Sequence, residues 1–125
     1  MPADSPDAVE PVPEEALPPS EALALARDLL ERGRPFFAHD VLEAVWKAAP
    51  AQERDLWQGL AQVCVGLTHS QRGNPAGARR LLERGAGRLD DAAPGHGVDP
   101  AAVAAWARAA AAGTPGSPGG PLRLR

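Results

Sequence analysis

Breaks made of glycine, proline and capping residues divide this chain into segments of helical length, and they constrain its fold more than any other feature. Glycine is favoured just after a helix, and proline suits the first position of the next one. A polar capping residue directly before that proline strengthens the signal. The breaks lie at Gly33-Arg34-Pro35, Pro50, Gly73-Asn74-Pro75 and Asp99-Pro100. We therefore expect an all-α fold, a compact bundle of about five helices.

The breaks also set the expected helix boundaries. The first helix begins with Ser20 as its cap and stops at Gly33, and the last begins at Pro100 after Asp99 and ends at Gly113. Between them the pattern predicts helices over residues 35–49, 50–72 and 75–89, with the second and third helices central in the bundle. No run of alternating β-branched residues predicts a strand.

Composition separates one domain from two terminal segments. Residues 1–19 are rich in proline and acidic residues, and we expect them to be disordered. Residues 113–125 are rich in glycine and proline, and we expect a flexible, dispensable tail. The helical domain is expected over residues 20–112.

Charge and cysteine usage limit the partners and the compartment. The net charge is −3 without a basic stripe, so no nucleic-acid partner is expected. The longest uncharged run, residues 56–71, is shorter than the roughly 20 apolar residues of a membrane span, so no membrane association is expected. Cys64 is the single cysteine, and the N-terminus lacks the pattern of a signal peptide. We expect a cytoplasmic protein. The sequence leaves a protein partner and homo-oligomer formation open.

The second helix carries one narrow polar strip. His39 and Glu43 lie one turn apart, about 40° from each other around the helix axis. Trp46 flanks them, Asp40 lies further round, and most of the remaining circumference is apolar. A helix of this pattern is central, with only a strip available for polar contacts.

The third helix has a similar strip centred on Gln62. The residues within about 40° of it are Asp55, Gln58, Gly66 and His69. Uncharged polar groups beside a glycine favour a strip that faces another helix. If the second and third helices pack antiparallel, we expect His39, Glu43, Gln62 and His69 to converge.

Three interpretations of this cluster stay open. It is a structural hydrogen-bond network, a pocket for a small ligand or partner, or a metal site in which His39, Glu43 and His69 bind a divalent ion such as zinc. The first two describe a binding or interaction module, and the third a metal-dependent, hydrolase-like enzyme. Cys64 is expected to be a packed thiol and His96 an exposed loop residue.

Several segments resemble one known family. Phe37-Ala-His39-Asp-Val-Leu-Glu43-Ala-Val-Trp46 is similar to the signature of the DUF309 family, small prokaryotic proteins of unknown function. The resemblance continues through residues 54–62, 66–69 and 72–78 and covers about residues 20–90. The family's usual pattern has His-Glu where this chain has His39-Asp40. The resemblance implies a helical bundle and no agreed activity, and it maps the family's recurring polar residues onto the four residues of the cluster.

Overall fold

The computed structural model describes residues 12–13, 15–113, 122 and 124, and the described chain is helical. Its α-helices are α1 (Pro19–Glu31), α2 (Pro35–Ala48), α3 (Arg54–Gln71), α4 (Pro75–Asp90) and α5 (Pro100–Ala111), with a 3₁₀ turn η1 (Ala51–Glu53). Over these residues the only β-type pairing is an isolated bridge between Gly95 and Val98. The all-α prediction is confirmed.

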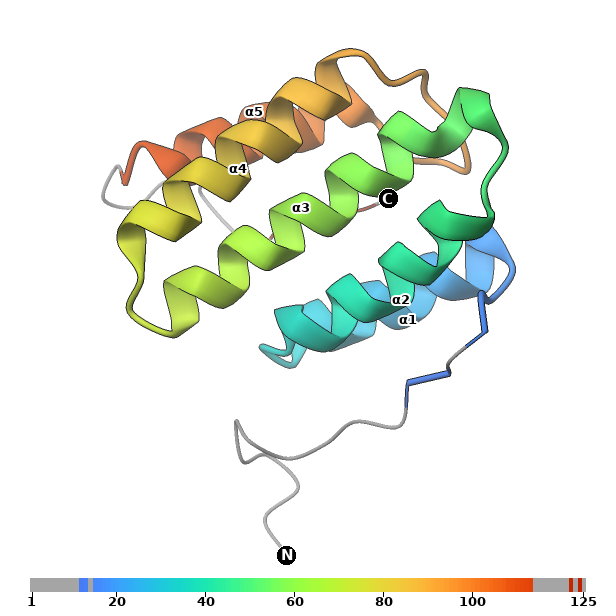
Figure 1. Cartoon of the computed structure of the whole chain (residues 1–125), viewed down its shortest axis with the longest axis horizontal. Helices are drawn as coiled ribbons and strands as arrows, with labels where there is room; N and C mark the ends of the chain where they lie inside the picture. The colour runs from blue at the N-terminus through green and yellow to red at the C-terminus, as the bar shows by residue number, and fades with distance from the viewer. Residues whose placement is uncertain (1–11, 14, 114–121, 123, 125) are drawn as a thin grey trace, which may run out of the picture.

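The helices form two layers (Figure 1). α2, α3 and α4 lie side by side in the front layer of this view, with α1 behind α2 and α5 behind α4. α3 is central because it packs on both α2 and α4. Its fully buried side chains, Trp57, Leu60, Val63 and Cys64 among them, join leucines of the other helices in one hydrophobic core.

Glycines allow α3 and α4 to approach closely. A Cβ on Gly59 would lie 2.7 Å from Leu89 Cγ and 3.2 Å from the carbonyl oxygen of Gly85. A Cβ on Gly85 would in turn lie 3.0 Å from the backbone oxygen of Gly59. These glycines weaken each helix as an isolated segment, but here they permit backbone-to-backbone packing that larger residues would prevent.

The N-caps predicted from the sequence are observed at α4 and α5 but not at α1. Asn74 Oδ1 accepts from the Gly77 amide, and Asp99 Oδ1 accepts from Ala101 and Ala102. The prediction that Ser20 caps the first helix is wrong, since α1 begins at Pro19 with Pro18 as its N-cap and no side-chain cap bond. Proline at the first helical position needs no amide hydrogen, so this helix starts two residues earlier than a Ser20 cap would place it.

Both predicted terminal segments contact the core where the structure describes them. Val12 and Leu17 are partly buried against it, as is Leu122, and Leu124 is only 1% exposed. A freely flexible segment does not bury its leucines, so these residues depart from the expectation of loose termini. The rest of both segments lies outside the described residues.

Candidate functional site

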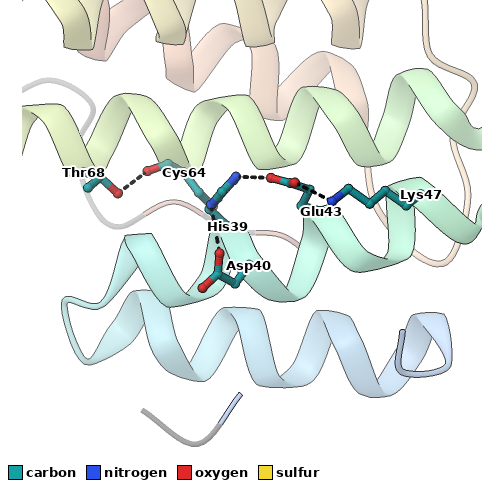
Figure 2. A network of polar contacts seen from close by, with 6 residues as sticks. All are labelled: His39, Asp40, Glu43, Lys47, Cys64 and Thr68. Carbon is teal, nitrogen blue, oxygen red and sulfur yellow. Dashed lines mark hydrogen bonds and ion pairs between the residues drawn. The ribbon is translucent and has the colours of Figure 1, made fainter. Parts of the chain in front are cut away.

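The site on α2 is built around a histidine–glutamate pair (Figure 2). His39 Nε2 lies 2.5 Å from Glu43 Oε2, and Lys47 Nζ lies 3.0 Å from Glu43 Oε1. These residues follow one another at one-turn intervals, so the helix itself aligns them. The exposed fraction rises from 19% for the His39 side chain to 34% for Glu43 and 65% for Lys47. The network therefore runs from the helix interface out to water.

Glu43 is held in its charged form. The hydrogen bond from Lys47 lowers the pKa of Glu43 below its ordinary value, and the neighbouring His39 adds to this against the opposing effect of burial. A carboxylate that stays ionised is an acceptor for both neighbours. His39 Nε2 therefore serves as the donor in this pair.

α2 and α3 run antiparallel, as two contacts at their opposite ends show. The Arg72 guanidinium lies 5.4 Å from the Phe36 ring centroid near one end, and that of Arg54 lies 5.2 Å from the Trp46 ring near the other. His39 and Glu43, between Phe36 and Trp46 on α2, therefore lie opposite the middle of α3. In Figure 2 the His39 ring lies beneath the turn of α3 that carries Cys64 and Thr68.

The Thr68 hydroxyl finds its hydrogen-bond partner within its own helix. Its Oγ1 donates to the Cys64 carbonyl at 2.9 Å, and the residue is 6% exposed. Cys64 is fully buried, as expected for a packed thiol, and burial raises its pKa to about 12. A protonated, inaccessible thiol has no nucleophilic role in the folded state.

In the part of the chain that the structure describes, two polar side-chain atoms, one on α2 and one on α3, are buried without a hydrogen-bond partner: His39 Nδ1 and Gln62 Oε1. Asp40 Oδ1 lies 3.4 Å from His39 Nδ1, within ion-pair range but without the geometry of a hydrogen bond. With Nε2 donating to Glu43, the neutral form of the His39 ring has Nδ1 as an acceptor, and the amide oxygen of Gln62 is an acceptor too. α2 and α3 thus each carry one buried acceptor that lacks a donor.

His69 does not join this group. Its Nδ1 lies 3.1 Å from Asn74 Nδ2, at the N-terminus of α4, and a Cβ on Gly77 of α4 would lie 3.0 Å from it. Gly66 likewise packs against Leu82 of α4. The expectation that this part of the α3 strip faces α2 is corrected, because the close neighbour across Gly66 is α4.

The metal triad is consequently not assembled. Across the chain that the structure describes, no group of three histidine, cysteine, aspartate or glutamate side chains lies close enough to hold a metal ion. His39 and Glu43 come together, but His69, the third proposed ligand, is held at the start of α4.

The secondary candidates take separate positions. Asp55 Oδ1 lies 3.4 Å from the Arg88 guanidinium of α4, and Trp46 stacks with Arg54. Gln58 is half-buried on α3. Asp40 alone stays beside the histidine–glutamate pair, at its Nδ1 side.

A second polar cluster, formed by Glu53, Trp57 and His96, was not predicted from the sequence. Glu53 Oε1 accepts from Trp57 Nε1 at 3.1 Å and lies 2.8 Å from His96 Nε2, whose ring centroid is 5.5 Å from that of Trp57. The hydrogen bond with His96, and then that from Trp57, lowers the pKa of Glu53 below its ordinary value. One-turn spacing of Glu53 and Trp57 is visible in the sequence, but nothing local indicates His96, which comes from the loop before α5.

The fold and this site define a small helical-bundle domain with a polar pair on its second helix. Residues 23–81 match the family model described as "Domain of unknown function (DUF309)", which confirms the family resemblance over that segment. The chain is also 44% identical over 48 residues to "Uncharacterized protein YpuF" of Bacillus subtilis (strain 168). That match covers 38% of this chain and 28% of the relative, so the chain spans about a quarter of that relative's length. No solved structure matches the chain significantly. Among the described helices, none combines the length and apolarity that crossing a membrane requires.

Proposed function

We propose that this protein is a binding module, and that His39 and Glu43 on α2, together with Gln62 on α3, recognise a group on its partner that donates hydrogen bonds. The observation that carries the proposal is the pair of buried acceptors, His39 Nδ1 and Gln62 Oε1, that have no donor. Buried polar atoms without partners cost free energy, so they are rare unless another molecule satisfies them.

The charge around the site favours a cationic donor. Asp40 and Glu43 supply two carboxylates beside His39, and Lys47 already pairs with one of them. A guanidinium or ammonium group on a partner would meet acceptors of matching polarity.

A metal-dependent hydrolase is less well supported. Such a site needs three protein ligands and an open position for water, whereas the interface offers His39 and Glu43 already bonded to each other. The net charge of −3 and the buried Cys64 support the further proposal of a cytoplasmic location without a nucleic-acid partner.

The test uses a defined probe, N-acetylarginine amide, with N-acetylglutamate amide as the probe of opposite charge. We expect saturable shifts of the His39 ring and Gln62 amide NMR signals with the arginine probe only. His39→Ala and Gln62→Leu should each abolish those shifts, whereas Glu83→Gln, on the exposed face of α4, should leave them unchanged.

Zinc chloride titrated into untagged protein separates the two functions. Stoichiometric zinc binding that is lost in His39→Ala would replace the binding module with a metal site. Equal, non-saturating shifts with both probes in the variants and the unaltered chain would contradict the proposal itself.

A further inference from the structure

The outward surface of α4 is rich in arginine. α4 forms the edge of the front layer in Figure 1, packed on α3 beside it and on α5 behind it. Arg79, Arg80 and Arg84 are exposed on its remaining surface. Arg80, Arg84 and Arg88 follow one another at one-turn intervals, and we call this row the α4 ridge. Like charges at this spacing destabilise a helix, so the stability of α4 alone does not explain the ridge.

The partner of Arg88 shows what this ridge binds. The Arg88 guanidinium lies 3.4 Å from Asp55 Oδ1, near the start of α3. About one turn further along α3 stands Gln58, which is uncharged. Arg80 and Arg84 form no ion pair with any of the described residues. One carboxylate from a neighbouring helix thus meets the ridge, and the described helices supply none to its other two arginines.

On the other described helices, most exposed cations already have a partner. The ion pairs are Arg32 with Asp28 on α1, Lys47 with Glu43 on α2, and Arg108 of α5 with Asp90 of α4. Arg27 on α1 is an exception, with no ion pair among the described residues and no second arginine one turn away. Within the described helices, unpaired arginines at one-turn spacing therefore occur on α4 alone, and Arg27 offers a matched control.

The shortness of the ridge decides among anionic partners. A nucleic-acid site typically neutralises several phosphates, and a polybasic membrane site uses about 4–8 basic residues. The unpaired arginines of α4 are fewer, and Glu83 lies among them. A guanidinium pairs with a single carboxylate through two parallel hydrogen bonds. Two carboxylates one turn apart on a helix therefore match Arg80 and Arg84 in both chemistry and spacing.

We propose that the α4 ridge is a docking surface for an acidic helix of a protein partner, which presents carboxylates one turn apart to Arg80 and Arg84. The partner helix continues along the ridge the arrangement that Asp55 begins at Arg88. Its carboxylates also remove the repulsion between neighbouring arginines of α4. This surface does not depend on the function proposed for His39 and Glu43.

The experiment uses two synthetic peptides and the full chain. The spaced peptide is an alanine-rich, acetylated and amidated helix with glutamate at every fourth position. The scrambled peptide has the same composition, with its glutamates distributed around the helix. In the ¹⁵N-labelled chain, the spaced peptide should produce saturable shifts of the Arg80 and Arg84 side-chain N–H signals. The scrambled peptide should bind more weakly.

Substitutions give the expected magnitudes. Arg80→Gln and Arg84→Gln should each weaken binding of the spaced peptide by about 10-fold, measured by fluorescence anisotropy, because each removes one charge-assisted pair. Arg27→Gln should leave the affinity unchanged. An equal loss in Arg27→Gln, or equal binding of the two peptides, would show general charge attraction and overturn the proposal.

The remaining outcomes need no substitution in the chain. Spaced-peptide shifts that map to α2 instead of α4, or that do not saturate, would refute the ridge as a docking surface. A double-stranded DNA oligonucleotide and phosphatidylglycerol vesicles are the competing probes. Tighter binding of either one than of the spaced peptide would replace the acidic helix with a phosphate-bearing partner.

Discussion

A Cβ atom on Gly66 of α3 would lie 2.7 Å from Leu82 Cγ on α4 and 3.1 Å from the Leu82 backbone nitrogen. Gly66→Ala therefore forces the two helices apart, because backbone cannot move aside as a flexible side chain can. We expect the free energy of unfolding to fall by about 1–3 kcal/mol, measured by urea denaturation.

Gly87 provides the matched control within α4. No atom lies within 4 Å of a Cβ placed there, so Gly87→Ala gains helix propensity without a clash. It should stabilise the protein by roughly 0.4–1 kcal/mol. If both substitutions stabilise, the close packing of α3 on α4 at Gly66 is incorrect.

The helix ends could be predicted because their signals are local. Asn74 and Asp99 cap the helices that follow them, and the glycines at 33, 73 and 113 adopt the positive φ that favours glycine at a helix end. The prediction of Ser20 as an N-cap was wrong because Pro18 and Pro19 provide an equally local signal that starts the helix earlier.

The neighbour of each helix face could not be predicted in the same way. A helical wheel places Gly66 and His69 on one side of α3, but it does not say which helix covers that side. The answer depends on α4, whose Leu82 and Asn74 contact them. Leu124 escaped prediction for a related reason, since two leucines in a glycine- and proline-rich tail show no helical period.

The Glu53–His96 contact predicts a stability change in acid. The pKa of Glu53 is lowered in the folded state from its ordinary value of 4.5, so the folded protein holds the proton less tightly than the unfolded chain. Its contribution to stability is present above about pH 4.5 and is lost as the pH falls through the lower, folded pKa.

Glu53→Gln should flatten that part of the pH dependence, measured as the urea midpoint from pH 7 to pH 3. Glu83→Gln, on the exposed face of α4, is the control and should keep the slope of the unaltered chain. An unchanged slope in Glu53→Gln would contradict the role assigned to this carboxylate.

The Cys64 thiol should resist modification in the native protein. It is fully buried, and burial raises its pKa to about 12, so the reactive thiolate is scarce at neutral pH. A thiol reagent such as dithionitrobenzoate should react only as fast as the protein opens, and urea should accelerate the reaction. Rapid stoichiometric labelling of the folded chain would show that the thiol is accessible.

At Gln62, stability and binding should respond to substitution in opposite directions. Its Oε1 is buried without a hydrogen-bond partner, so Gln62→Leu replaces an unsatisfied acceptor with an apolar group of similar size. We expect the variant to be more stable by about 1–3 kcal/mol in the absence of any ligand. The same substitution should remove binding of the arginine probe, because the acceptor is gone.

Gln58→Leu, one turn earlier on α3 and also half-buried, is the control and should change stability by less than about 0.5 kcal/mol. A destabilised Gln62→Leu variant would mean that the amide is satisfied in the folded protein, and the acceptor pair would then no longer support a binding site.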